Sequence, residues 1–237
     1  MKTSQLVSAL LFFTACASAS AGTVTLYESS TPFTVSTNNS NVVEAQTVTT
    51  ANTDILVNLA FAYSGVLNGN DFLSLWFGYD AAGSSSDKNV SADHTNGPNI
   101  GIKGNGGSGT STLDLFVRNT GTGGNWLAGS AIAPNVTYQL FGHLYKSAGS
   151  STYNRFDAWL NPTAEEMNTL TGADATSTDN SGITALNTFG FRSANLDSGD
   201  SISVSNVSIQ AIPEPGTIAL AGIALFGLAG LASKKRK

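Results

Sequence analysis

Apolar residues alternate with polar residues in many short runs along the middle of the chain. The clearest run spans residues 55–63 and places these side chains on one side of an extended backbone: Ile55, Val57, Leu59, Phe61 and Tyr63. A period of two is typical of a strand with one buried face. Clusters of Gly, Asn, Asp and Ser separate the runs, and these residues favour turns. The pattern therefore predicts a chain built from β-strands.

Comparable runs predict strands at residues 23–28, 32–35, 42–50, 72–79, 100–103, 113–118, 137–146, 153–160, 187–192 and 202–209. The pair 137–146 and 153–160 is expected to form a hairpin, and residues 163–170 a single helical turn. Loops are predicted at residues 119–125 and 171–181 from their Gly, Thr, Asp and Ser content. Short, evenly spaced strands without an amphipathic helix predict an all-β fold, an antiparallel two-sheet sandwich of the jelly-roll type.

Both ends of the chain differ from this body. Residues 1–21 resemble a signal peptide, with Lys2, an apolar stretch at residues 6–15 and small residues up to Ala21, after which we expect cleavage by signal peptidase. Cys16 raises the alternative of a lipid-modified cysteine. The residue three positions before it is Phe13, where such a site has an aliphatic residue, so peptidase cleavage is favoured.

Residues 212–237 contain three consecutive signals. Pro213, Glu214 and Pro215 form an extended spacer, because proline fixes φ and keeps the preceding residue out of the helical region. Residues 217–232 carry no charge and can form a transmembrane helix, whose backbone satisfies its own hydrogen bonds in lipid. The basic end would remain cytoplasmic; its residues are Lys234, Lys235, Arg236 and Lys237.

This order resembles the PEP-CTERM sorting signal of bacterial envelope proteins. The resemblance implies recognition and cleavage by a membrane-embedded exosortase. A helix over residues 217–232 is about 24 Å long, shorter than the roughly 30 Å of hydrocarbon in a bilayer, which suits transient retention. The alternative is an ordinary anchor that stays attached. We expect export from a Gram-negative-type bacterium through a membrane-anchored precursor to the cell surface or extracellular matrix.

The remaining residues, 22–211, are predicted to form one β-sandwich domain. They include six Lys/Arg and fifteen Asp/Glu, a formal charge of about −9, which argues against a basic surface for nucleic acid. Once residues 1–21 are removed no cysteine remains, which excludes disulfides and thiol chemistry.

A second resemblance lies within the body. The sequence Trp159-Leu160-Asn161-Pro162 is followed by Glu165-Glu166, by Gly190-Phe191-Arg192 and by a final Ser/Val/Ile strand. This arrangement resembles concanavalin A-like, laminin-G-like domains, which are common in proteins with this tail. The resemblance implies a lectin-type sandwich, although a fold does not by itself imply sugar binding.

Catalytic patterns are weak. Glycoside hydrolysis uses two carboxylates across a cleft, and the alternating acids that supply them in this sandwich family are absent. Glu165 and Glu166 are neighbours in a turn and are expected to be solvated. The histidines are His94 and His143, and no Gly-x-Ser-x-Gly elbow precedes a helix, although a Ser-His-Asp arrangement of distant residues stays open. The prediction is a protein without catalytic residues, not an enzyme.

Metal-binding patterns are equally sparse, and neither a metal site nor a cofactor is assigned. Two histidines without cysteine do not make a conventional zinc site unless carboxylates contribute. Calcium is the open alternative, because two acidic loops offer hard oxygen ligands; they contain Asp174, Asp179 and Asn180, and Asp197 and Asp200. Asp and Asn are also ordinary turn residues.

Tryptophans are the candidates for carbohydrate contact. Trp76 and Trp159 stand in apolar strands and are expected in the core, whereas Trp126 stands beside a glycine-rich loop and is the candidate sugar contact. The sequence thus favours an exported, non-catalytic structural or adhesive module. The alternative is a lectin-like module that binds glycan or exopolysaccharide, with a glycoside hydrolase third.

Overall fold

The computed structural model describes residues 22–36, 44–69, 71–79, 97–104, 113–121 and 123–213. The predicted signal peptide, Glu214, Pro215, the predicted membrane helix at 217–232 and the basic residues 234–237 lie outside these ranges, as does His94. No helix within the described ranges is both long enough and apolar enough to cross a bilayer.

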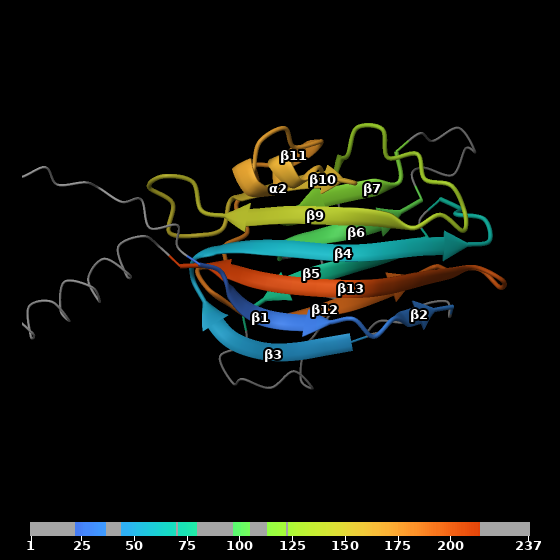
Figure 1. The fold of residues 1–237 in the computed structure, drawn as a ribbon, viewed down its shortest axis with the longest axis horizontal. Helices are drawn as coiled ribbons and strands as arrows, with labels where there is room; N and C mark the ends of the chain where they lie inside the picture. The colour runs from blue at the N-terminus through green and yellow to red at the C-terminus, as the bar shows by residue number, and fades with distance from the viewer. Residues whose placement is uncertain are drawn as a thin grey trace, which may run out of the picture. The chain divides into compact units, whose positions relative to one another are not determined.

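Two antiparallel sheets form the body, as the sequence predicts (Figure 1). The seven-stranded sheet has the order β1 (Val24–Ser29), β13 (Ser201–Ile212), β4 (Asp54–Ser64), β9 (Tyr138–Tyr145), β10 (Arg155–Leu160) and β11 (Ala175–Ser177), and β2 (Phe33–Val35) also pairs with β13. The six-stranded sheet has the order β3 (Glu44–Ala51), β12 (Leu186–Ala194), β5 (Phe72–Gly78), β6 (Asn99–Lys103), β7 (Leu115–Arg118) and β8 (Asn125–Trp126). In Figure 1 the strands β4, β9 and β13 lie in front of β5, β6 and β12, so the sheets stack as two layers.

Strand β4 shows the predicted alternation most clearly. Ile55, Val57, Leu59 and Phe61 are buried in the apolar cluster between the sheets, while the residues between them are only partly buried. β4 pairs with β13 on one side and β9 on the other, which fixes its position inside the seven-stranded sheet. The alternation therefore determines which polar side chains of this sheet face outward.

Strand β5 is buried on both faces, which explains why its apolar residues do not alternate with polar ones. Leu73, Leu75 and Phe77 point into the cluster between the sheets. Trp76 is fully buried, as is Trp159 on β10, yet neither belongs to that cluster. The prediction that both tryptophans are buried is confirmed, but they lie on the outer faces of their sheets and not in the central core.

The predicted hairpin of β9 and β10 is present with the expected antiparallel register. The helical turn is also present, as α2 (Ala164–Thr169), and it begins with a capping box between Thr163 and Glu166. The loop predictions at 119–125 and 171–181 are wrong in part, because each contains residues of a short edge strand, β8 and β11. Strands of two or three residues are too short to show a period.

Gly101 on β6 provides a test of how closely the strands of the six-stranded sheet approach. A Cβ atom at this position would overlap the carbonyl oxygen of Leu73 and lie 2.7 Å from the Cα atom of Ser74. Because backbone atoms cannot move aside cheaply, we expect Gly101→Ala to lower the free energy of unfolding by about 2–3 kcal/mol in urea denaturation. Gly123→Ala, where a Cβ atom would meet nothing within 4 Å, should leave stability nearly unchanged. Equal stabilities for the two variants would contradict the packing argument.

Candidate functional site

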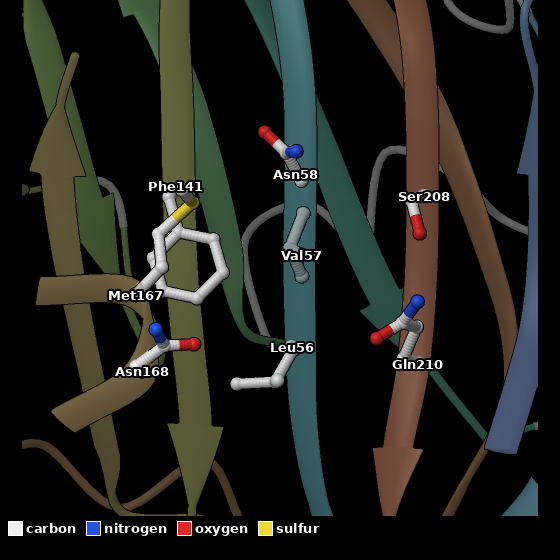
Figure 2. Close-up of a pocket in the computed structure, with 8 residues that line it drawn as sticks. All are labelled: Leu56, Val57, Asn58, Phe141, Met167, Asn168, Ser208 and Gln210. Carbon is white, nitrogen blue, oxygen red and sulfur yellow. The ribbon is translucent and has the colours of Figure 1, made fainter. Parts of the chain in front are cut away.

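A pocket of about 280 Å³ opens on the outer face of the seven-stranded sheet. Figure 2 shows its lining residues, which come from β4, β9, β13 and α2. They are Leu56, Val57, Asn58, Phe141, Met167, Asn168, Ser208 and Gln210. The volume lies just below the usual range of small-molecule sites, about 300–1,000 Å³, so it suits part of a larger molecule.

The floor of the pocket follows from strand alternation. Because Val57 and Ile209 are buried between the sheets, their neighbours Asn58, Ser208 and Gln210 face outward. Ser208 lies opposite Asn58 in the register of β13 and β4, and Gln210 lies opposite Leu56. The register therefore brings the carboxamides of Asn58 and Gln210 and the hydroxyl of Ser208 together around the side chain of Leu56.

The wall opposite β13 is built by the turn after β10. Trp159 packs against Phe141, with ring centroids 5.4 Å apart, and its indole nitrogen donates a hydrogen bond of 3.0 Å to the carbonyl of Thr171. Both rings are buried on the outer side of the sheet. Figure 2 shows Met167 of α2 beside Phe141, and Asn168 next to it. The chain after β10 thus folds back over the two aromatic rings and supplies the wall.

Asn161 connects this turn to the floor. Its backbone adopts the left-handed conformation, with φ of 51°. Its side-chain oxygen accepts a hydrogen bond of 2.8 Å from the backbone N–H of Gln139. The Gln139 side chain in turn donates to the Asn58 oxygen at 2.9 Å and contacts the Met167 sulfur at 3.8 Å. The Asn58 side chain is therefore held in one orientation before any ligand arrives.

Three other polar groups of the pocket are open. Within the described part of the chain, the side chains of Asn168, Ser208 and Gln210 make no hydrogen bond to protein. None of the lining residues that the structure describes is charged. The site thus offers carboxamides and a hydroxyl, which both donate and accept hydrogen bonds, beside the apolar surfaces of Leu56 and Met167.

A second polar cluster adjoins the pocket. Leu56 is opposite His143 in the register of β4 and β9, and His143 is opposite Asp157 on β10. The side chain of His143 is 9% exposed, its ring stacks on that of Tyr145 with centroids 4.4 Å apart, and its Nε2 atom lies 3.1 Å from a carboxylate oxygen of Asp54. Burial, with the Asp157 carboxylate as the next cause, raises the pKa of Tyr145. The two carboxylates of this cluster, Asp54 and Asp157, are both hydrogen-bonded. Asp54 pairs with His143, and Asp157 accepts a bond of 2.6 Å from the Thr176 hydroxyl.

Trp126, the sugar contact predicted from the sequence, lies on β8 in the other sheet. It is half-buried and meets the ring of Phe116 edge-on, with centroids 6.1 Å apart. The Arg118 guanidinium lies 4.8 Å from the Phe116 ring centre, and burial, followed by the charge of Arg192, lowers the pKa of Arg118 to about 10. Trp126 is therefore not part of the pocket, and its role in sugar contact stays a prediction.

Glu165 and Glu166 stand on α2, where Glu165 is exposed. Glu166 accepts hydrogen bonds of 2.7 and 2.9 Å from the backbone nitrogen and the hydroxyl of Thr163, which lowers its pKa. Its carboxylate therefore completes the capping box in which Thr163 is the N-cap residue.

Three of the aspartates considered for calcium accept hydrogen bonds from the protein itself. Asp174 accepts a hydrogen bond of 2.8 Å from the amide of Leu160, and Asp197 accepts one of 2.8 Å from the Asn68 side chain. Asp200 accepts one of 2.8 Å from the amide of Val66. The described ranges contain no group of three or more His, Cys, Asp or Glu residues that could hold a metal ion.

The pocket residues were missed from sequence alone. Asn58, Ser208 and Gln210 are polar members of alternating strands, so the same pattern that identified the core also contains them. What the pattern does not contain is the register, which decides which of these outward positions become neighbours.

Residues 211–237 match the PEP-CTERM protein-sorting motif. The match includes Pro213, Glu214, Pro215 and the basic end, and it confirms the resemblance inferred from these residues. The motif marks an exported bacterial protein that exosortase sorts from a membrane-anchored precursor. No curated protein matches the chain.

Solved structures resemble the sandwich itself. Carbohydrate-binding module CBM66 from Bacillus subtilis matches with a TM-score of 0.43 and 14% identity, covering 81% of this chain and 98% of that one. The metal-free carbohydrate recognition domain of Emp46p matches with a TM-score of 0.42 and 9% identity, covering 79% and 85%. A mutant alginate lyase, Aly36B, in complex with alginate trisaccharide matches with a TM-score of 0.40 and 12% identity. The match covers 68% of this chain and 71% of that one. Likenesses this weak describe the fold and carry nothing about activity.

Asp71 leads to a prediction about pH. Burial raises its pKa above the usual 3.8, the charges of Asp200 and Asp197 add to this, and a hydrogen bond from Asn68 opposes it. Because the fold favours the protonated form, the wild-type protein loses stability as the pH rises from 3.8 through the raised pKa. We expect the stability of Asp71→Asn, relative to wild type, to increase over that pH range in urea unfolding.

Glu166→Gln should show the opposite trend. The Glu166 pKa is lowered below the usual 4.5, so its contribution to stability is present above pH 4.5 and is lost as the pH falls. Relative to wild type, this variant should therefore become less stable as the pH rises. A difference between Asp71→Asn and wild type that does not change with pH would contradict the burial argument.

Proposed function

We propose that this exported, exosortase-sorted protein is a structural or adhesive component of the cell envelope or extracellular matrix, and that its sandwich binds polysaccharide without catalysis. The observation that carries the proposal is the pocket, where the polar side chains of Asn168, Ser208 and Gln210 make no hydrogen bond to another described residue and lie next to apolar side chains. The laminin-G-like, concanavalin A-like subclass inferred from the sequence belongs to the same proposal.

The chemistry of the pocket suits a sugar ring. Sugar hydroxyls donate and accept hydrogen bonds, as carboxamides do, and the C–H faces of the ring are apolar. The pocket offers Asn58 and Gln210 for the hydroxyls, and Leu56 and Met167 for the apolar face. Because the Gln139 side chain already holds Asn58 in place, little conformational freedom is lost on binding.

The absence of catalysis is supported by how the carboxylates are used. Next to the pocket, Asp54 is hydrogen-bonded to His143 and Asp157 to Thr176, while Glu166 caps α2. Glycoside hydrolysis needs one protonated and one ionised carboxyl group across the substrate. These three carboxylates hold the protein's own side chains and backbone, whereas Glu28 and Glu165 near the pocket are exposed.

Single substitutions in the pocket test the binding site. Asn58→Ala and Gln210→Ala should each weaken polysaccharide binding about ten-fold, because each removes a hydrogen bond worth about 1–1.5 kcal/mol. Affinity electrophoresis or calorimetry with the exported protein measures this. Thr49→Ala, at an exposed position on β3 of the other sheet, is the matched control and should bind as wild type does. Loss of binding in Trp126→Ala with normal binding in both pocket variants would place the site on β8 instead.

The processing prediction concerns the tail. We expect the mature protein, isolated from its host, to end near Pro213, Glu214 and Pro215 when its mass is measured. A membrane-bound species that still ends at Lys237 would show a permanent anchor and contradict cleavage by exosortase.

A further inference from the structure

We propose that the pocket selects uncharged polysaccharides and rejects polyanionic ones such as polyuronates. This inference rests on the proposed polysaccharide binding and adds the charge class of the ligand. It follows from the pocket lining, from the charges at its rim and from the positions of the nearby cations.

The described lining residues include no cation to pair with an anionic sugar. Carboxylate and sulfate groups are recognised chiefly by Arg and Lys, or by several donors aimed at one oxygen. The polar lining here consists of Asn58, Asn168, Ser208 and Gln210, and each side chain brings an acceptor together with its donors. An anion would place its negative charge beside those acceptor oxygens, whereas a hydroxyl can donate to them.

Carboxylates flank the pocket on two sides. Glu28 on β1 is exposed and lies directly opposite Ser208 in the antiparallel register. Glu165 is exposed on α2, three residues before the lining residue Asn168 and so on the same side of the helix, and the last turn of this helix has no basic residue. Asp54 is also on this face, two residues before Leu56 on β4, with its side chain 43% exposed. The rim is therefore negative on the β1 side and on the α2 side.

The described basic residues at the end of β9 and the start of β10, Lys146 and Arg155, are hydrogen-bonded to backbone carbonyls. Lys146 donates a hydrogen bond of 2.9 Å to the carbonyl of Asn52 and lies 5.0 Å from the ring centre of Tyr153. Arg155 donates bonds of 2.8 and 3.3 Å to the carbonyls of Asn154 and Thr178. With a charge of about −9 for residues 22–211, the field around the pocket repels a polyanion.

Two pairs of polymers that share a backbone test the selectivity. Hydroxyethylcellulose is compared with carboxymethylcellulose, and highly methyl-esterified pectin with polygalacturonate, using the exported protein at low and high salt. At low salt, we expect the neutral polymer of a pair to bind at least about ten-fold more tightly than its anionic counterpart. Added salt should reduce this difference, because it screens the rim carboxylates. Binding of the neutral polymer should not depend on salt.

Charge reversal at the rim locates the effect. Glu28→Lys and Glu165→Lys should each increase binding of the anionic polymer several-fold at low salt and leave neutral binding unchanged. Asp179→Lys changes the net charge equally at an exposed position outside the pocket, and it should have little effect.

The outcomes separate the two proposals. Anionic binding as tight as neutral binding at low salt, abolished by Asn58→Ala, would overturn the selectivity and leave the polysaccharide site intact. An equal response of Asp179→Lys and the two rim variants would also overturn it, because net charge rather than the rim would then decide. Failure of every polymer to bind would overturn both proposals.

Discussion

The pairing of β4 with β13 on one side and β9 on the other is the constraint on which the structure depends. It buries Ile55, Val57 and Phe61 against the second sheet and, by the same alternation, turns Leu56 and Asn58 outward. A shift of one residue in this register would bury the polar face and expose the apolar one. The core and the pocket are therefore two results of one register.

The turn after β10 converts a flat outer face into a pocket. The left-handed backbone of Asn161 redirects the chain, Trp159 fixes the returning segment through its indole hydrogen bond, and Met167 lies beside Phe141. Asn161 also supports Gln139, whose side chain orients Asn58. A four-residue motif, Trp-Leu-Asn-Pro, thus positions groups on β4, β9 and α2 that are distant in the sequence.

Sequence patterns predicted the sandwich because long strands such as β4 and β13 repeat their period many times. They did not predict β8 and β11, which are too short to show a period. They also did not predict that Trp76 and Trp159 lie on the outer faces of their sheets, because an apolar residue in a strand can be buried on either face. The tail was predictable because its three signals are contiguous. The pocket instead depends on contacts between β4 and β13, such as that of Asn58 with Ser208, which join residues some 150 positions apart in the sequence. Trp126 was chosen as the sugar contact because tryptophan is rare and typical of sugar sites. The many Asn and Gln residues of the chain could not be ranked from the sequence.

The strand that forms part of the pocket floor is also the strand that leads into the sorting motif. Gln210 is only three residues from Pro213 along β13. A pull on residue 213 would therefore enter the domain at the end of β13. The ladders that join β13 to β1 and β4 would pass that pull to the rest of the sheet.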